Sequence, residues 1–286
     1  MKKYLFIVLL VWVWSCEDEQ KKDCSGVPGG TAVLDNCDQC VGGETGLTAC
    51  IEDCNGEWGG TAIADCAGVC DGDNPDQDND GICDWNDGDS YTTIIIGDQE
   101  WMVENLKVTH YKNGDSIPRA YSGSEWNNLS TGAYAVYDDS ESNLDTYGNL
   151  YNWYAVDDDR GICPEGWRVP TDDEFTALTN YLGGENVAGG KLKECTEGSC
   201  PESNYWFGPN AGATNESGFT GLPGGQRLGH PVYADCQWIR ENAYFWSSTD
   251  ANNSAAFYRQ LYNMRSDIDR ALFSKEYGLS VRCIKD

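Results

Sequence analysis

The sequence predicts an α+β fold after residue 90, with mainly antiparallel strands, long polar loops and one or two helices. Most of the aromatic residues of the chain (11 Trp, 16 Tyr and 7 Phe in all) lie in this part, which is enough for a sizeable core. Tyr91–Ile96 and Gln99–Val103 flank Gly97-Asp98, a pattern typical of a β-hairpin. Residues 172–182 carry the clearest helix pattern.

This helix has signals at both ends. Thr171-Asp-Asp-Glu174 is a capping box, in which each end residue hydrogen-bonds the backbone amide of the other. Three apolar residues at helical spacing share one face: Phe175, Leu178 and Leu182. Gly183-Gly184 then ends the helix, and a short helical turn is expected near 186–193.

Two further segments predict strands. Tyr147–Val156 is rich in aromatic residues and is followed by three aspartates, so a buried strand is expected there. In the last strand apolar and polar residues alternate: Leu279, Val281 and Cys283 with Ser280, Arg282 and Ile284. This alternation predicts a half-buried strand.

The composition excludes several classes of function. A formal net charge of −28 is unsuited to nucleic acid, because phosphate binding needs clustered Lys and Arg. It also disfavours docking on anionic lipid. Fourteen cysteines with only two histidines indicate an oxidising compartment rather than a series of zinc sites.

The N-terminus has the pattern of a bacterial lipoprotein signal. Lys2-Lys3 precede the apolar run Tyr4–Trp14, and Ser15-Cys16 follow. We therefore expect a signal peptide at 1–15 and a lipid on Cys16, followed by a tether at 16–22. The acidic residues after Cys16 favour a lipid-anchored location at the outer membrane, on the cell surface. The alternative is an ordinary signal peptide with a chance cysteine.

Residues 23–75 contain two cysteine-rich repeats. Asp23–Asp35 matches Asp53–Asp65 at an offset of 30 residues, and the pair Cys37/Cys40 corresponds to Cys66/Cys70. Cys50 and Cys83 close the two units. Few large apolar residues are present, so disulfides are expected to hold the segment. Zinc at Cys37 and Cys40 is the alternative, and the sequence leaves the connectivity of the bridges open.

Residues 76–89 have the spacing of a calcium-binding loop. The expected ligands are five carboxylates and one backbone carbonyl: Asp76, Asp78, Asp80, Asp84 and Asp87 with the carbonyl of Ile82. Gly81 allows the sharp turn. Calcium is the expected cofactor, and it would stiffen a stalk. The alternative is an acidic linker that binds nothing.

Several motifs of 91–286, in order, carry a family resemblance: Gln99–Leu106, Tyr111–Gly114, Tyr147–Leu182, Gly190–Lys193, Ala213–Phe219, Leu222–Gly225, Phe245–Thr249 and Gly278–Asp286. The region resembles the Fibrobacter succinogenes major paralogous domain (FISUMP). This resemblance implies a secreted domain related to C-type-lectin-like folds, with no catalytic residues to transfer.

The same motifs guide the cysteine pairing. The resemblance implies that the C-terminal strand lies beside an early strand and that Cys163 pairs with Cys283, since both lie in family motifs. Cys195 and Cys200 are expected to pair locally. Cys236 is left over, either as a buried thiol or as one half of an intermolecular bridge.

Tryptophans in polar loops are the candidate ligand-binding residues. Trp126 and Trp238 are the preferred candidates, and Trp206 and Trp246 lie in similar loops. Aromatic faces beside amides and carboxylates suit sugar rings, whereas the alternative is that these tryptophans are core. We assign Trp153 and Trp167 to the core.

The sequence therefore predicts a surface lipoprotein that displays a non-catalytic binding or adhesion domain for glycan or extracellular protein ligands. A structural component of the envelope or a fibre is the second hypothesis. The lectin-like relation raises a third, an enzyme of the formylglycine-generating type, but those enzymes use paired cysteines and Cys283 is better explained as structural. His110 and His230 are isolated in sequence, so neither is expected to act as a base.

Overall fold

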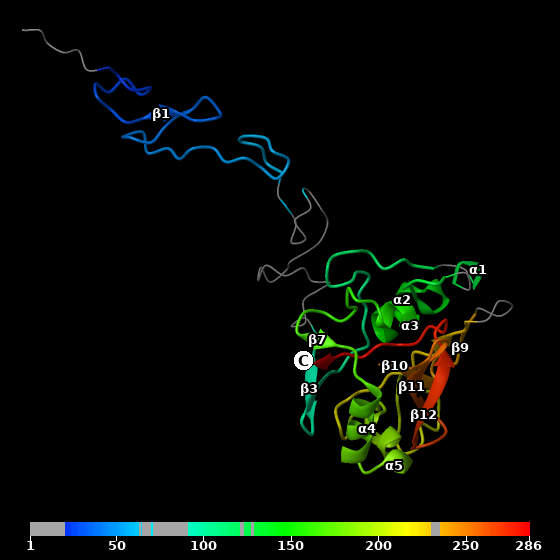
Figure 1. Cartoon of the computed structure of the whole chain (residues 1–286). Coiled ribbons are helices and arrows are strands. Elements are labelled where there is room, and N and C mark those ends of the chain that lie inside the picture. Colours follow the sequence, from blue (N-terminus) through cyan, green and yellow to red (C-terminus); the bar gives the residue numbers. More distant parts are fainter. Residues whose placement is uncertain are drawn as a thin grey trace, which may run out of the picture. The chain divides into compact units, whose positions relative to one another are not determined.

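The chain divides into two compact units, Met1–Asp73 and Asn74–Asp286. The structure, a computed structural model, describes residues 21–62, 64, 70, 91–120, 123–126, 129–229 and 235–286 (Figure 1). Cys16, the predicted calcium loop Asp76–Asp87 and His230 lie outside the described residues, as do Cys66 and Cys83. Among the helices that are described, none is long and apolar enough to cross a membrane.

Disulfides hold the first unit together, as expected from its small apolar content. A short hairpin of β1 (Val33–Leu34) and β2 (Cys40–Val41) lies in the first repeat. The bridges are Cys24–Cys40, Cys37–Cys50 and Cys54–Cys70. The first and third correspond at the offset of 30 residues, so the two repeats share this part of their connectivity. Cys37 and Cys40 therefore form disulfides, as preferred over zinc.

One aspartate organises the start of each repeat. Asp23 accepts hydrogen bonds from the backbone amides of Val27 at 3.0 Å and Ala32 at 3.1 Å. Asp53 repeats this pattern with the amides of Glu57 at 2.9 Å and Ala62 at 3.2 Å. The hydrogen bond from the Ser25 hydroxyl, together with these amides, keeps the pKa of Asp23 below the usual range, and the amide of Glu57 is the main cause of the same lowering of the pKa of Asp53.

A glycine makes room for each of these carboxylates. A Cβ added at Gly30 would lie 1.9 Å from Oδ2 of Asp23, and one at Gly60 would lie 1.9 Å from Oδ2 of Asp53. We expect Gly30→Ala to break the hydrogen bonds of Asp23 and to speed amide hydrogen exchange of residues 23–32 roughly tenfold, at about 1 kcal/mol for each bond lost. Mass spectrometry of the whole chain measures this exchange.

Glu44→Ala is the control, because Glu44 is an exposed residue of the same repeat. This substitution should leave the hydrogen exchange of residues 23–32 unchanged. Gly60→Ala should have the corresponding effect on residues 53–62. Unaltered exchange in either glycine variant would show that the aspartate can keep its hydrogen bonds when a side chain is present at the glycine position.

The second unit contains two main antiparallel sheets. One has the strand order β3-β4-β13-β7 and the other the order β10-β11-β12. Their strands are β3 (Thr93–Ile96), β4 (Gln99–Met102), β7 (Trp167–Arg168), β10 (Asn242–Asn252), β11 (Ala255–Tyr262), β12 (Ile268–Ser274) and β13 (Ile284–Lys285). The predicted hairpin of β3 and β4 is confirmed, and β13 pairs with β4 through Ile284 and Trp101.

Two shorter hairpins and several helices complete this unit. The hairpins pair β5 (Tyr134–Ala135) with β6 (Leu150–Tyr151) and β8 (Gln226–Arg227) with β9 (Cys236–Gln237). The helices are α1 (Gly123–Trp126), η2 (Tyr137–Asp139), α2 (Glu141–Tyr147), α3 (Trp153–Val156), α4 (Asp172–Tyr181) and α5 (Glu185–Leu192). The described unit thus has more helices than the one or two expected.

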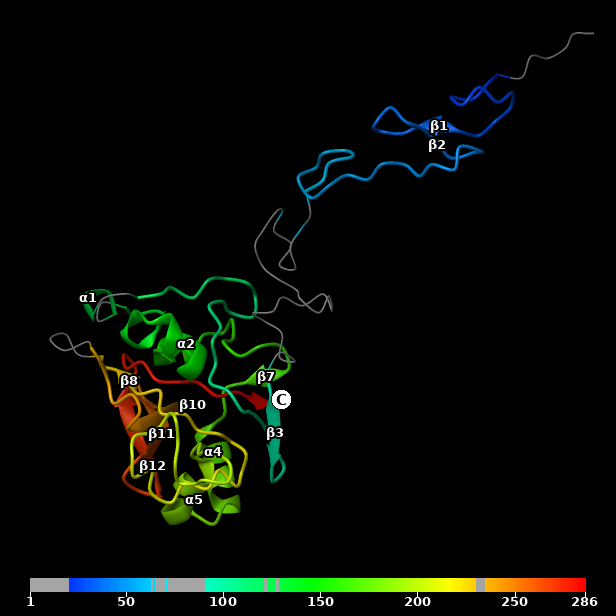
Figure 2. The ribbon, with the colours of Figure 1, turned by 180° about the vertical axis from the view of Figure 1, so that it is seen from behind.

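Helix α4 confirms the local prediction. Thr171 accepts a hydrogen bond from the amide of Glu174, whose carboxylate accepts one from the amide of Thr171. The predicted apolar face is buried, and Phe175 packs on Trp101 of β4 with ring centroids 5.2 Å apart. Figure 2 shows α4 and α5 together at one end of this unit, near the three-stranded sheet.

The strand predicted at Tyr147–Val156 is mostly wrong. Only β6 is extended, because Gly148 has a φ of 74° and Asn152 begins α3 by accepting a hydrogen bond from the amide of Ala155. The predicted burial is correct, since Tyr151 and Trp153 lie in the core.

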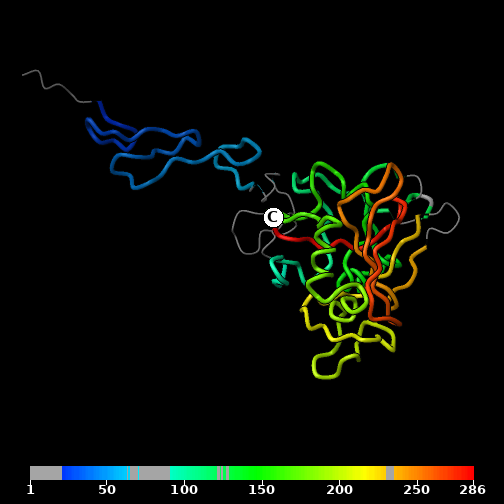
Figure 3. Tube along the Cα trace, turned by 60° about the horizontal axis from the view of Figure 1, so that its bottom comes forward, coloured from blue at the N-terminus to red at the C-terminus, as the bar shows by residue number. Residues whose placement is uncertain are grey.

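The C-terminal segment is buried on both faces rather than on one. All residues from Leu279 to Ile284 are buried. The segment runs through the middle of this unit, with chain on both sides (Figure 3). The amide of Trp246 donates to Ser280 on one side, and that of Leu106 donates to Val281 on the other. The alternation was misleading because Arg282 is also buried, stacked on Phe219 and bonded to Asn105.

Candidate functional site

Trp126 is a core residue and not a ligand platform. Only 1% of its surface is exposed, and its indole N–H donates to the carbonyl of Glu276. The guanidinium of Arg227 lies 5.2 Å from its ring, and a Cβ at Gly278 would meet it at 2.9 Å. The prediction for Trp126 is therefore wrong, because partners distant in sequence cover the ring.

Five other tryptophans among the described residues are also buried: Trp101, Trp153, Trp167, Trp206 and Trp246. This confirms the assignment of Trp153 and Trp167 to the core. The indole N–H groups of Trp153 and Trp246 donate to the carbonyls of Ser247 and Tyr151, both at 2.9 Å. The rings of Trp153 and Trp246 are therefore enclosed in the core of the unit.

Both bridges expected in this unit are present. Cys163 and Cys283 form a disulfide, and so do Cys195 and Cys200. Cys236 is a free thiol in β9, half-buried and opposite Arg227. Burial raises the pKa of this thiol, so at neutral pH it is protonated and a poor nucleophile.

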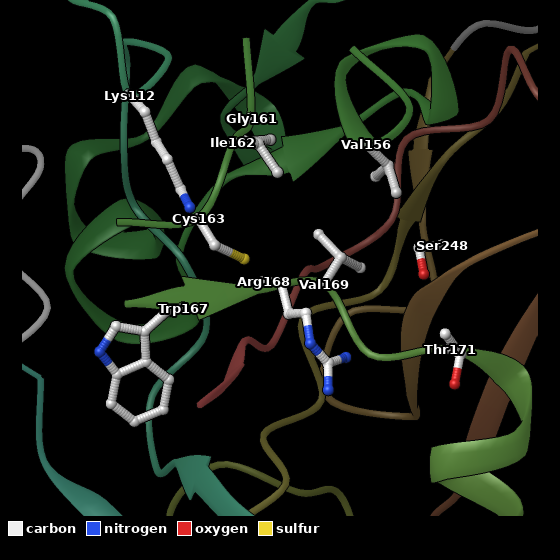
Figure 4. Close-up of a pocket in the computed structure, with 10 residues that line it drawn as sticks. All are labelled: Lys112, Val156, Gly161, Ile162, Cys163, Trp167, Arg168, Val169, Thr171 and Ser248. Carbon is white, nitrogen blue, oxygen red and sulfur yellow. The ribbon is translucent and has the colours of Figure 1, made fainter. Parts of the chain in front are cut away.

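A pocket of about 260 Å³ lies beside the Cys163–Cys283 bridge (Figure 4). It is lined by Lys112, Val156, Gly161, Ile162, Cys163, Trp167, Arg168, Val169, Thr171 and Ser248. Figure 4 shows the Cys163 sulfur and the Val169 side chain close together within this lining, with the Lys112 chain reaching toward Cys163. The walls are mainly apolar.

The charge of Arg168 in this pocket is already neutralised. Its guanidinium makes a bidentate pair with Glu174 at 2.6 and 2.7 Å, and its Nε lies 3.5 Å from Asp286. The pairing with Glu174 is also the main reason that the pKa of Arg168 is raised. This arginine fixes the start of α4 and is not available to an anionic ligand.

Trp238 is exposed, as a ligand-binding residue should be. It shows 47% of its surface, and two aromatic residues of another loop are also exposed, Tyr205 at 37% and Phe207 at 46%. We call these three residues the aromatic surface. Large exposed aromatic side chains on neighbouring loops mark interaction sites more often than scattered single ones do.

Arg240 joins the two loops that carry this surface. Its guanidinium stacks on Phe207 at 4.4 Å and donates to the carbonyls of Tyr205 at 3.0 Å and Asn204 at 3.1 Å. The amide of Phe207 in turn donates to the carbonyl of Arg240 at 2.7 Å. The loops are therefore fixed to each other before any ligand arrives.

The loop that carries Trp238 also has an unusual backbone conformation. Trp238 and Arg240 have φ values of 68° and 66°, in the left-handed region that non-glycine residues seldom adopt. Their loop lies against Gly225, where a Cβ would come within 2.5 Å of the carbonyl of Gln237. The Leu222-Pro-Gly-Gly225 motif thus supports the loop that presents Trp238.

A second pocket, of about 450 Å³, lies on the loop that carries Tyr205 and Phe207. It is lined by Pro201, Glu202, Ser203, Trp206, Gly208, Pro209 and Asn210, and we call it the 201–210 pocket. Trp206 points inward between its two exposed neighbours and donates to the carbonyl of Gly221 at 3.0 Å. One loop therefore forms both the pocket and part of the aromatic surface.

The family model described as Fibrobacter succinogenes major domain matches residues 94–285. The chain belongs to this family. No curated protein and no solved structure matches the chain. In this member of the Fibrobacter succinogenes major domain family, the motifs quoted from the sequence mostly build the core, whereas the aromatic surface lies on loops between them.

Tyr205 and Phe207 are not among the ligand-binding residues predicted from the sequence. Both lie in Asn-Tyr-Trp-Phe, where one large ring follows another. Trp206 is only 3% exposed whereas both of its neighbours are exposed, and the run of three large rings does not indicate which of them is buried. Arg240 had no signal of its own, because its role depends on the approach of a loop that is 35 and 36 residues away in sequence at the two carbonyls it bonds.

Proposed function

We propose that this protein is a bacterial surface lipoprotein whose second unit is a non-catalytic, C-type-lectin-like domain that binds glycans. The lipid anchor would be at Cys16, on the outer membrane. The cysteine-rich repeats and a calcium-bound loop at 76–87 would form the stalk. The antiparallel pairing of β13 with β4, at opposite ends of the family domain, and the small number of long helices support the lectin-like assignment.

The aromatic surface is the observation that carries this proposal. Pyranose rings present C–H faces, which stack on aromatic side chains, and hydroxyl edges, which hydrogen-bond to nearby carbonyls and carboxylates. Because Arg240 fixes both loops in advance, little conformational entropy is lost when a ligand binds. Insoluble polysaccharide, which offers many equivalent rings, is the favoured ligand class.

We expect Trp238→Ala to weaken binding of the mature chain to its best polysaccharide roughly tenfold, which corresponds to about 1.4 kcal/mol and is within the range of an exposed aromatic contact residue. Pull-down isotherms on a panel of insoluble polysaccharides measure this. Alanine is as compatible with the left-handed φ as tryptophan is, so the variant should keep its thermal stability.

Trp58→Ala is the matched control, because Trp58 is equally exposed, at 49%, but lies in the first unit. It should bind like the unaltered chain. Equal losses for Trp58→Ala and Trp238→Ala, or none for Trp238→Ala, would remove the aromatic surface as the site. Binding that survives EDTA would assign calcium to the stalk alone. Failure of every polysaccharide to bind would favour a protein ligand or a structural role in the envelope.

A further inference from the structure

We propose that three backbone carbonyls of the second unit form a cation site, which the chain fills with the ammonium group of its own Lys193 and which positions both loops of the aromatic surface. The ligand class of this site is a primary ammonium. The positioning step rests on the proposed function, whereas the cation site does not. Lys193 acts through these loops and does not itself touch the glycan.

The cation site is built from distant parts of the chain. Lys193 directly follows helix α5 and is 0% exposed. Its Nζ donates to the carbonyls of Ala211, Tyr262 and Arg265, each at 2.8 Å. These carbonyls belong to the loop after residue 210, the end of β11 and the turn that follows it. An ammonium group has three N–H donors, so the three carbonyls use all of them. Converging backbone carbonyls are also how proteins hold cations that have lost their water.

The surroundings of Lys193 suit a single positive charge. Burial lowers the pKa of Lys193 to about 8, and the nearby carboxylate of Asp267 acts in the opposite direction. The ammonium group is therefore still charged at neutral pH. One oxygen of Asp267 pairs with Arg265 at 3.1 Å, and the other has no hydrogen-bond partner among the described residues. The 2.8 Å distances exceed the roughly 2.3–2.6 Å of calcium–oxygen bonds, so an ammonium fits better than this divalent metal.

The turn that Lys193 holds is bonded to both loops of the aromatic surface. The amide of Ala211 donates to the carbonyl of Asn263 at 2.7 Å, and the amide of Asn263 donates to the carbonyl of Glu241 at 2.8 Å. Ala211 directly follows the loop that forms the 201–210 pocket, and Glu241 lies in the loop that carries Trp238. One internal cation therefore fixes a turn that both loops share.

Replacing the lysine and supplying its missing part tests the cation site. Lys193→Ala deletes three methylene groups and the ammonium, which leaves a space with the shape of n-propylammonium. This amine should raise the thermal-unfolding midpoint of the mature Lys193→Ala chain by about 3 °C more than tetramethylammonium does at equal concentration. Tetramethylammonium has the same charge but no N–H donor. Scanning calorimetry measures both midpoints.

Two matched variants control this rescue. Lys193→Met fills the same space with a side chain that has no donor, so n-propylammonium should not rescue it. Lys191→Ala removes a partly exposed lysine of α5, which pairs with Glu216 at 2.7 Å, and should not respond either. An equal rise in all three variants would be a general solvent effect and would overturn the cation site. The absence of a rise in folded Lys193→Ala would overturn it as well.

The unaltered chain provides a test that does not depend on the folding of a variant. The ammonium hydrogens of Lys193 should exchange slowly with water at neutral pH, because all three are buried and hydrogen-bonded. Nitrogen–hydrogen correlation NMR of isotope-labelled protein should therefore resolve this group, and Lys193→Met identifies its signal. If Lys193→Ala does not fold even with the amine, this signal decides: its presence supports the site and its absence overturns it.

Polysaccharide binding tests the positioning step separately. Lys193→Ala should bind polysaccharide about tenfold more weakly than the unaltered chain, because loosened loops must be ordered when the ligand binds. n-Propylammonium should restore this binding. Rescue of thermal stability with polysaccharide binding unchanged throughout would keep the cation site and overturn the positioning step. If the unaltered chain binds no polysaccharide, the proposed function and the positioning step fail together, and the calorimetric rescue still decides the cation site.

Discussion

Replacing both Cys163 and Cys283 with alanine is expected to lower the free energy of unfolding of the second unit by about 5 kcal/mol. The two cysteines are 120 residues apart, and a cross-link over so long a loop removes much conformational entropy from the unfolded chain. The bridge also ties the residue just before β13 to the segment just before β7, and these two strands are neighbours in the four-stranded sheet. Urea unfolding followed by tryptophan fluorescence would measure the loss.

The Cys195–Cys200 bridge provides an internal comparison. Its cysteines are only 5 residues apart, so the same chain-entropy relation gives about 2 kcal/mol when both become alanine. The order of the two losses is the critical result. A larger loss from the short bridge would mean that native packing, and not loop closure, determines what these disulfides contribute.

Asp172→Asn should lower the free energy of unfolding by about 3–5 kcal/mol, because it leaves a buried arginine without its counter-charge. The carboxylate of Asp172 lies 2.5 Å from Nη1 of Arg259 and 2.8 Å from Nη2 of Arg270. The side chain of Arg259 is only 2% exposed, so water cannot replace the lost partner. Chemical denaturation measures the loss.

Asp173→Asn changes the next residue of the same helical turn and is the control. Asp173 is exposed, so its change should cost less than about 0.5 kcal/mol. The double variant Asp172→Asn, Arg259→Met should lose less free energy of unfolding than the two single variants do in sum. With Arg259 replaced, Asp172→Asn no longer leaves that buried charge unpaired. Strict additivity would contradict the ion-pair explanation.

The same pair gives a pH dependence with a defined sign. Burial alone would raise the pKa of Asp172, but the hydrogen bonds from Arg270 and Arg259 outweigh it and hold the pKa below its usual value. The stabilisation is therefore complete above about pH 4, the range of an unfolded aspartate, and is lost as the pH falls through the folded pKa. The difference between the unaltered chain and Asp172→Asn should shrink in acid.

The parts of the fold that could be predicted depend on neighbours in sequence. The capping box of α4 and the turn between β3 and β4 need only a few adjacent residues, and both are present as expected. The composition of the two repeats, which have few large apolar residues, likewise predicts that disulfides hold them together. The Cys163–Cys283 bridge was an exception, since the family motifs supplied the information that local patterns lack.

What could not be predicted depends on distant partners. Trp126 and Trp238 both lie in polar sequence, yet the carbonyl of Glu276 and the side chain of Arg227 cover the first, while a left-handed backbone exposes the second. The alternating pattern places Arg282 on the polar face of a strand. In the structure its guanidinium stacks on the ring of Phe219 and donates to the amide oxygen of Asn105 inside the core. No pattern within a short window contains these contacts.

The repeats have a consequence for the history of the chain. The bridge Cys54–Cys70 and the bridges of the first repeat each close within one repeat, and the hydrogen bonds that Asp23 and Asp53 accept come from described residues up to nine positions ahead. Among the described residues, no covalent link joins one repeat to the next. Duplication or loss of one repeat by recombination would therefore leave the cross-links of the other repeat intact.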